Sequence, residues 1–232
     1  MIELPEAAVL AKQINETAVG KKIKNVIAAH TPHKLAWYFG DPQEYKGLLA
    51  GKIVSGATSY GGQVEITAGT AKLLFSDGVN LRYYNKGAKL PDKHQLLLEF
   101  DGGSCLVGWV QMYGGLSAFP DGKNDNKYYL VAKEKPSPLC SDFDEDYFKS
   151  LFDEGIAKLP LKAFLATEQR IPGLGNGVMQ DILFNANGVL AFQRRFESRP
   201  KRRQRSHRSV PEPREAQGQR QEAGEAHADP RR

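Results

Sequence analysis

The residues Gly173-Leu174-Gly175-Asn176-Gly177 lie between two predicted helices and have the types that an anion-binding turn needs. Glycine lets the backbone approach a ligand closely, and the free amides at the start of a following helix attract a phosphate. A dinucleotide-binding loop would require a preceding strand in a βαβ unit, and no such strand is predicted. Taken alone, the run is explained more simply as a turn between two helices.

The residues around this turn favour a functional interpretation. The stretch from Phe164 to Phe184 resembles the helix–two-turns–helix motif of the formamidopyrimidine-DNA glycosylase/endonuclease VIII family. The opening, Met1 to Glu6, independently resembles the family's Met-Pro-Glu-Leu-Pro-Glu. Two separate matches in the right order around a β-rich region argue against coincidence. The resemblance extends over about Met1 to Asn187, although the intervening strands match in layout more than in identity.

The resemblance implies a chemistry for the N-terminus. In that family the enzyme flips a damaged base out of the duplex and cuts its glycosidic bond. The N-terminal amine, usually of proline, attacks C1′ and forms a Schiff base, and elimination then nicks the strand. The resemblance places this nucleophile at Met1 or Ile2, the catalytic acid at Glu3 and the second acidic position at Glu6. The simpler alternatives are a solvated terminal carboxylate for Glu3 and a helix-capping acid for Glu6.

The resemblance also implies contacts to DNA. Asn176 matches the asparagine that grips a backbone phosphate, in a loop that Gly173 and Gly175 shape. The family's intercalation loop, often Arg-Arg-Phe-Gly, is replaced here by a stretch in which Met112 or Tyr113 would fill the gap left by a flipped base. Ordinary packing at the end of a strand explains these two side chains equally well.

Two positions depart from the family pattern. Ile2 stands where proline is usual, so the free amine would belong to Met1, which is a primary amine displaced by one residue. The family's hairpin lysine is missing from the corresponding stretch, Ser59 to Gln63. Lys72 lies further along and could replace it only in a different strand register.

The predicted fold is α+β, with an N-terminal helix, an antiparallel β-sandwich and a helix–two-turns–helix domain. Apolar residues at helical spacing predict a helix from Leu4 to Val19. Short alternating runs separated by glycine-rich turns predict strands, and Asp77-Gly78 is interpreted as a hairpin turn. These strands are Ile23 to Ala29, Lys52 to Thr58, Gln63 to Thr67, Ala71 to Ser76, Val79 to Tyr84, Gln95 to Phe100 and Ser104 to Met112.

The pattern becomes helical in the second half of the chain. Lys127 to Lys133 is predicted as one more strand, and Asp142 as the cap of a helix from Phe143 to Glu154. Further helices are predicted near Pro160 to Thr167 and from Asn176 to Asn187. The expected divisions are a β-sandwich domain at 1–120, a linker at 121–140, a DNA-binding domain at 141–192 and a disordered tail at 193–232.

The tail differs from the rest in composition. The formal net charge of the chain is +5, yet residues 193–232 hold twelve basic and six acidic side chains, leaving 20 and 21 for the body. Eleven of the twelve are arginines, whereas the body has eighteen lysines and two arginines. The tail is interpreted either as a basic nucleic-acid-binding arm or, preferably, as a frameshift product that replaces the family's zinc-finger region.

Composition limits the remaining choices. The sequence shows no membrane-length apolar run and no signal-peptide pattern, so a cytoplasmic protein at the bacterial nucleoid is expected. Cys105 and Cys140 cannot form a four-cysteine zinc site, and we expect neither metal nor cofactor. The predicted function is a monomeric DNA N-glycosylase, with or without abasic-site lyase activity, that excises an oxidised base from double-stranded DNA. The alternatives are a non-catalytic reader of damaged DNA and a truncated remnant.

Overall fold

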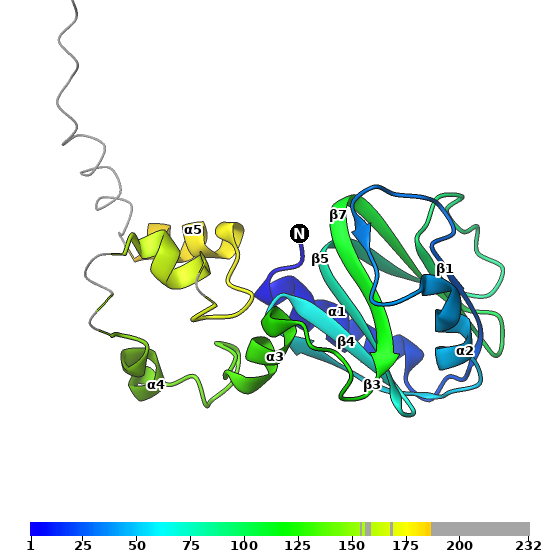
Figure 1. Cartoon of the computed structure of the whole chain (residues 1–232), viewed down its shortest axis with the longest axis horizontal. Helices are drawn as coiled ribbons and strands as arrows, with labels where there is room; N and C mark the ends of the chain where they lie inside the picture. Colours follow the sequence, from blue (N-terminus) through cyan, green and yellow to red (C-terminus); the bar gives the residue numbers. More distant parts are fainter. Residues whose placement is uncertain (154, 156–158, 168, 187–232) are drawn as a thin grey trace, which may run out of the picture. The chain divides into compact units, whose positions relative to one another are not determined.

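The computed structural model describes residues 1–153, 155, 159–167 and 169–186, all within one compact unit, Met1–Val189. Helix α1 (Leu4–Ala18) opens the chain and buries a stripe formed by Ala7, Ala11 and Ile14. Figure 1 shows α1 lying along strands β3 (Val54–Tyr60) and β4 (Gln63–Ala68). The amide of Asn15 fixes this contact: it donates to Ala57 O at 2.8 Å and accepts from Ala57 N at 2.7 Å.

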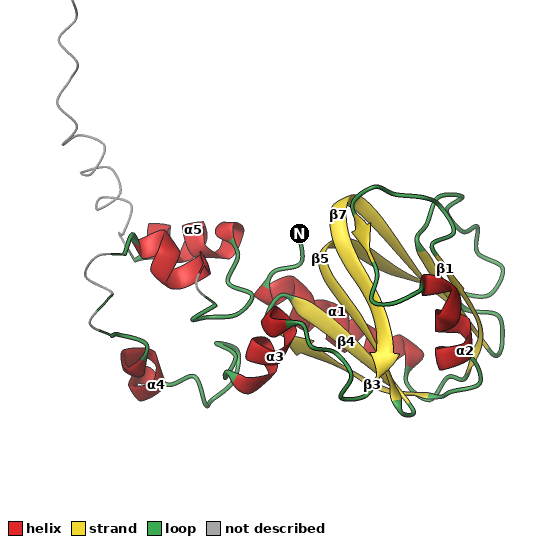
Figure 2. Cartoon of the chain, viewed as in Figure 1, coloured by secondary structure: helices red, strands yellow, loops and turns green. Residues whose placement is uncertain are grey.

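The strands form one sheet in the order β1-β6-β7-β5-β4-β3, with antiparallel pairing along this path. Figure 2 shows the strands in yellow and the helices in red. A short strand, β2, pairs in parallel with β7, and η1 (Pro42–Glu44) and α2 (Tyr45–Leu49) follow it. Residues from both halves of the sheet meet in one apolar core, which fits the predicted sandwich. The remaining strands are β1 (Ile23–Ala28), β2 (Ala36–Trp37), β5 (Ala71–Tyr84), β6 (Leu96–Phe100) and β7 (Cys105–Pro120).

The hairpin predicted at Asp77-Gly78 was wrong, because β5 runs straight through this position beside β7. The pairing instead shifts between Asp77, opposite Gly114, and Val79, opposite Val110. One residue of β5 therefore faces three of β7, residues 111–113, which bulge from the sheet. Asp77 has φ +60°, a left-handed conformation that asparagine and aspartate tolerate better than most residues. An Asp-Gly pair suits a bulge as well as a turn.

The strand predicted at Lys127–Lys133 was also wrong, since these residues form helix α3 (Lys127–Glu134). The Asn126 side chain caps the helix by accepting from Tyr128 N at 2.9 Å. Tyr129 and Ala132, three positions apart, are buried. The short apolar run was ambiguous between strand and helix, and the cap decided it.

The helices of the second half are shorter than predicted. α4 (Glu145–Ser150) is capped by Asp144, whose Oδ1 accepts from Tyr147 N at 2.7 Å, and not by Asp142. η3 (Ala163–Thr167) is a π-helical turn, and α5 (Asn176–Asn185) follows it. Predictions for Asn187 and for residues 193–232 lie outside the described residues, and the domain boundaries stay predictions. Within the described residues, no helix has the length and apolar character needed to cross a membrane.

Candidate functional site

The N-terminal segment is held between the sheet and the helical half. Ile2 is buried, and its amide donates to Asp77 O, on β5 next to the β7 bulge, at 2.5 Å. Leu4 N donates to Gly173 O at 3.0 Å, and the Leu4 side chain packs with apolar residues of the helical half, Phe164, Leu165, Ile171, Leu174 and Met179. The first residues of the chain therefore join the bulge to the loop before α5.

Three glycines allow this junction to close. Gly61 and Gly173 have φ values of +56° and +78°, where a side chain would add strain. A Cβ on Gly61 would lie 2.9 Å from Pro172 C, and one on Gly62 would lie 2.8 Å from Ile2 O. A Cβ on Gly173 would overlap the Gly61-Gly62 backbone. The hairpin between β3 and β4, where the family lysine was missing, is thus a backbone contact surface here.

The Glu3 carboxylate caps helix α5. Its Oε1 accepts from Gly177 N at 3.0 Å, and its Oε2 accepts from Val178 N at 2.9 Å. Glu3 is partly buried, and the positive end of the helix dipole favours its negative charge. Two of the amides expected to face a phosphate are therefore occupied by Glu3, which corrects the simple anion-site interpretation of this turn.

The turn residues leave one exposed polar side chain. Gly175 is the N-cap of α5, and a Cβ there would overlap the Glu3 carboxylate, so glycine is required by close approach. Asn176, the first residue of the helix, is exposed. A phosphate at this turn would therefore meet the Asn176 side chain and not a bare helix end. The structure brings Gly173, Gly175 and Asn176 together with Glu3, a contact that was not predicted from the sequence.

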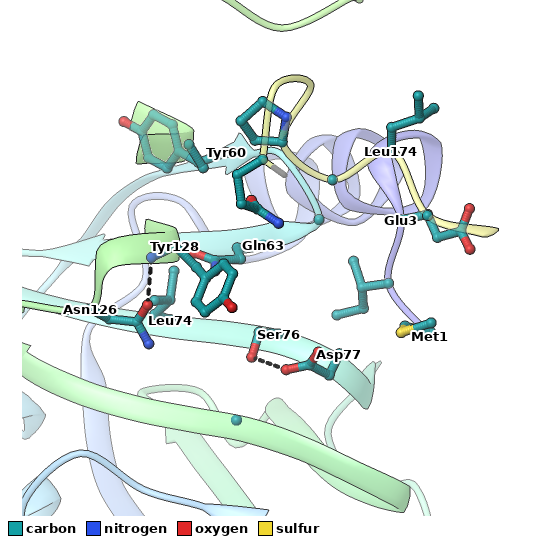
Figure 3. Close-up of a pocket in the computed structure, with 18 of the residues that line it drawn as sticks. Met1, Glu3, Tyr60, Gln63, Leu74, Ser76, Asp77, Asn126, Tyr128 and Leu174 are labelled. Carbon is teal, nitrogen blue, oxygen red and sulfur yellow. Dashed lines mark hydrogen bonds between the residues drawn. The ribbon is translucent and has the colours of Figure 1, made fainter. Parts of the chain in front are cut away.

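A cavity of about 730 Å³ opens beside the junction (Figure 3). Figure 3 shows Met1 and Glu3 on one side of this view and Tyr60, Asn126 and Tyr128 on the other. The lining also includes Trp37, Tyr38, Phe39, Gln63, Leu74, Ser76, Asp77, Ser117, Asn124, Lys162, Gln169 and residues 172–176. Polar, charged and aromatic side chains thus face the same space as the terminal residue.

The candidate catalytic residues do not all face this cavity. Met1, Ile2 and Glu3 line it, whereas Glu6 lines a second hollow of about 900 Å³ on the other side of the N-terminal segment. Glu6 Oε2 accepts from Glu3 N at 3.2 Å, so the side chain closes the first turn of α1. This contact supports the capping interpretation of Glu6.

The proposed wedge residues lie on the β7 bulge. Met112 is 70% exposed, and Tyr113 is partly buried beside the Trp37 ring, with 5.8 Å between the ring centroids. The Tyr113 hydroxyl contacts Met1 Sδ at 3.3 Å. These contacts fit ordinary strand-end packing of Tyr113, whereas the Met112 side chain is exposed. The role of either residue as a wedge stays a prediction.

Lys72 does not replace the missing hairpin lysine. Its Nζ lies 3.0 Å from Glu65 Oε1 and donates to Thr67 Oγ1 at 2.9 Å, in a largely buried position away from the cavity. Glu65 is 2% exposed and also accepts from the Tyr129 hydroxyl. Burial, followed by the hydrogen bond from Tyr129 to Glu65, raises the pKa of Tyr129 far above its usual value. This network ties α3 to the sheet.

Several lining residues were not identified from the sequence. Gln63 was noted only as part of a stretch without lysine, and Asp77 only as part of a turn. Ser76 donates to Asp77 Oδ2 at 2.7 Å, and Lys162 brings a primary amine to the lining. Two adjacent polar residues directly after the apolar run Leu73–Phe75 were the available signal for Ser76 and Asp77. Among the described residues, no three His, Cys, Asp or Glu side chains converge to hold a metal ion.

Sequence comparison identifies relatives of this chain, although no family model matches it. A formamidopyrimidine-DNA glycosylase of Acidiphilium cryptum (strain JF-5) is 30% identical over 193 residues, 82% of this chain and 66% of that protein. One of Streptococcus pneumoniae serotype 4 is 25% identical over 190 residues, 80% of this chain and 66% of that protein. The chain belongs to the formamidopyrimidine-DNA glycosylase family. It spans 66% of the length of these two relatives.

Solved structures of formamidopyrimidine-DNA glycosylases share the fold. MutM in complex with DNA containing carbocyclic 8-oxo-G has a TM-score of 0.62 and 23% identity, covering 78% of this chain and 67% of that one. The Lactococcus lactis enzyme bound to DNA with an abasic (AP) site has a TM-score of 0.61 and 23% identity, covering 78% and 68%. At this identity the structural likeness establishes the α+β fold, while the sequence relatives establish the family.

Proposed function

We propose that the chain is a DNA repair protein that binds damaged duplex DNA, flips out an oxidised base and excises it. The observation that carries the proposal is the meeting of Met1, Glu3 and the Gly173–Asn176 turn around one cavity. Asn176 would contact a backbone phosphate, and Met112 would fill the space that the flipped base leaves. The relatives and the DNA complexes named above support this function.

The proposed reaction begins at the Met1 amine. Its lone pair attacks C1′ while the glycosidic bond breaks and the departing base gains a proton. The attached nitrogen loses a proton, the sugar ring opens at O4′, which gains a proton, and the Schiff base forms. Removal of a proton from C2′ then drives β-elimination, in which the 3′ phosphate leaves. Glu3 would relay protons at the opened sugar. The protein would work as a monomer in the bacterial cytoplasm, at the nucleoid.

A second candidate function is a non-catalytic reader of damaged DNA. The specific observation in its favour is that both oxygens of Glu3 accept hydrogen bonds from backbone amides of α5. A carboxylate that holds a helix has less freedom to move protons. The displaced primary amine of Met1 favours the same alternative.

Borohydride trapping on a duplex with one abasic site tests the proposal. A covalent adduct is expected, and peptide mapping should place it on Met1, with Lys162 as the competing amine. An adduct on Lys162 would overturn the assignment of Met1. Binding of an uncleavable abasic analogue, with neither an adduct nor base release, would support the non-catalytic reader. Failure to bind the analogue would overturn both functions.

A further inference from the structure

The side-chain oxygen of Gln63 is an unpaired hydrogen-bond acceptor. Its Oε1 is buried and has no hydrogen-bond partner among the described residues, while the side chain lines the cavity. A buried carbonyl without a donor is unfavourable, because it has given up its hydrogen bonds to water and gained none in return. The last torsion of glutamine is broad, so a modest rotation turns this oxygen toward the cavity. A ligand with an N–H group would satisfy it.

Two asparagines that line the cavity supply hydrogen-bond donors. Asn124 is buried, and its Oδ1 accepts from Asn126 N at 2.9 Å. The Oδ1 of Asn126 accepts from Tyr128 N at 2.9 Å, at the start of α3. Both carbonyl oxygens are thus engaged in the loop, and neither NH₂ group forms a hydrogen bond within the described residues. The two NH₂ groups are therefore available to donate to a ligand.

The rest of this wall suits a flat, neutral ligand. Tyr60, Tyr128, Trp37 and Phe39 bring aromatic rings to the cavity, and Ser117 adds a hydroxyl. Glu3 lies on the other side of the view in Figure 3. Aromatic faces with a few oriented amides recognise a nucleobase by stacking and by hydrogen bonds to its edge. One acceptor and one or two donors match a lactam, in which a ring N–H adjoins a C=O.

We propose that Gln63 determines specificity for the flipped base, an inference that rests on the proposed function. Gln63 Oε1 accepts from a lactam N–H, and the NH₂ group of Asn124 donates to the adjacent carbonyl. Among the oxidised bases of the proposed function, the preferred substrates are therefore those that present an N–H beside a C=O. Cytosine and adenine present bare ring nitrogens on their pairing edges and leave Gln63 unpaired.

The test is a binding comparison with three duplexes. The first carries 5-hydroxyuracil, an oxidised base with an N–H beside a C=O, on a 2′-fluorinated sugar, which slows cleavage of the glycosidic bond, and the second its N3-methyl derivative. The third carries a tetrahydrofuran abasic analogue. The wild type should bind the first about three- to tenfold more tightly than the second, the net value of one hydrogen bond. Gln63→Leu should lose this preference while binding the second and third as the wild type does.

Control variants separate recognition from folding. Gln13→Leu, at an exposed position of α1 outside the cavity lining, should keep the preference. Gln63→Glu retains an acceptor and should keep a preference for the N–H form over the N-methyl form. The proposal is overturned if Gln63→Leu keeps the preference, or if it weakens binding to all three duplexes equally. A wild type that cannot bind the abasic analogue would contradict the proposed function itself.

Discussion

Glu3 and Val178, 175 positions apart in the chain, are joined by a 2.9 Å hydrogen bond from the Val178 amide to Glu3 Oε2. The other oxygen of the same carboxylate accepts from Gly177 N. The residue that the family resemblance assigns to proton transfer therefore also sets the position of the turn that would hold a phosphate. In the proposed function, proton transfer and the contact with DNA would therefore both depend on the Glu3 side chain.

Replacing Glu3 with glutamine should abolish base release and lower stability. A glutamine offers one oxygen, and its NH₂ group would face a backbone N–H, so the helix loses part of its cap. The expected loss is about 1 kcal/mol, or about 2–4 °C in Tm for a chain of this size. Base release and thermal unfolding measure the two effects.

Glu6→Gln is the matched control for Glu3→Gln. Glu6 contacts the backbone of Glu3 but does not line the cavity that Glu3 and Gln63 share, so Glu6→Gln should retain base release. Full activity in Glu3→Gln would remove Glu3 from the reaction and leave it only its capping role.

Gly173→Ala should be far more damaging than Gly20→Ala. The two glycines have nearly equal φ values, +78° and +80°, so the conformational strain of alanine is the same, about 1–2 kcal/mol. A Cβ on Gly20 meets nothing within 4 Å, whereas one on Gly173 overlaps the Gly61-Gly62 backbone. Urea unfolding of both variants isolates the steric contribution, and equal losses would show that the junction is loose.

Asn176→Ala should weaken DNA binding by a similar factor on every sequence tested. The exposed side chain lies at the start of α5, where a backbone phosphate and not a base edge would meet it. A loss of about 0.5–1.5 kcal/mol, or roughly two- to tenfold in Kd, corresponds to one hydrogen bond. Fluorescence anisotropy with several duplexes checks this, and a loss confined to one sequence would contradict the phosphate contact.

Met112→Ala should reduce binding to an abasic analogue without changing stability. The side chain is 70% exposed, so its removal leaves no cavity in the core. Inside a duplex, however, it would fill the space beside the unpaired base. The measurement is the ratio of affinities for abasic and intact duplexes. If that ratio stays at the wild-type value, Met112 is not the wedge.

The stability of the fold should fall as the pH rises above about 10, the ordinary pKa of tyrosine. Folding raises the pKa of Tyr129, so the folded chain keeps the proton that the unfolded chain releases. This contribution is complete below pH 10 and declines above it, because the unfolded state then binds fewer protons. Urea unfolding between pH 8 and 11 measures the decline.

Tyr129→Phe should be less stable than the wild type at pH 8, by about 1–3 kcal/mol, because Glu65 loses a buried hydrogen-bond donor. Its stability should also decline less steeply at high pH. Tyr128→Phe serves as the control, since Tyr128 is 62% exposed. Identical pH profiles for wild type and Tyr129→Phe would exclude Tyr129 as the titrating group.

The sequence predicts the features of this fold that depend on residues close together in the chain. The apolar stripe of α1 and the turn before α5 follow from periodicity and from glycine spacing. The Asp77-Gly78 pair was misassigned because a bulge and a hairpin turn need the same backbone conformation. A bulge and a hairpin turn differ in whether the strand goes on pairing with the same neighbour. β5 does so because β7 continues beside it, and the residue types of β7 did not reveal how long that strand is.

The candidate site was predictable in part. The family resemblance singled out Glu3 and Asn176, and the structure places both at the start of α5. The sequence could not show that both carboxylate oxygens of Glu3 accept hydrogen bonds from this helix, because the contact joins residues about 175 positions apart. Gln63 was missed for a related reason: an unpaired carbonyl is a property of its surroundings, not of its residue type.

The glycine junction has a consequence for inheritance. Every glycine codon begins with two guanines, so any single-base change that alters the residue either adds a side chain or ends translation. At Gly61, Gly62 and Gly173 a side chain would meet the backbone of another segment. These three codons therefore have no conservative neighbour, and natural variants should show them either unchanged or altered together with the segments that they face.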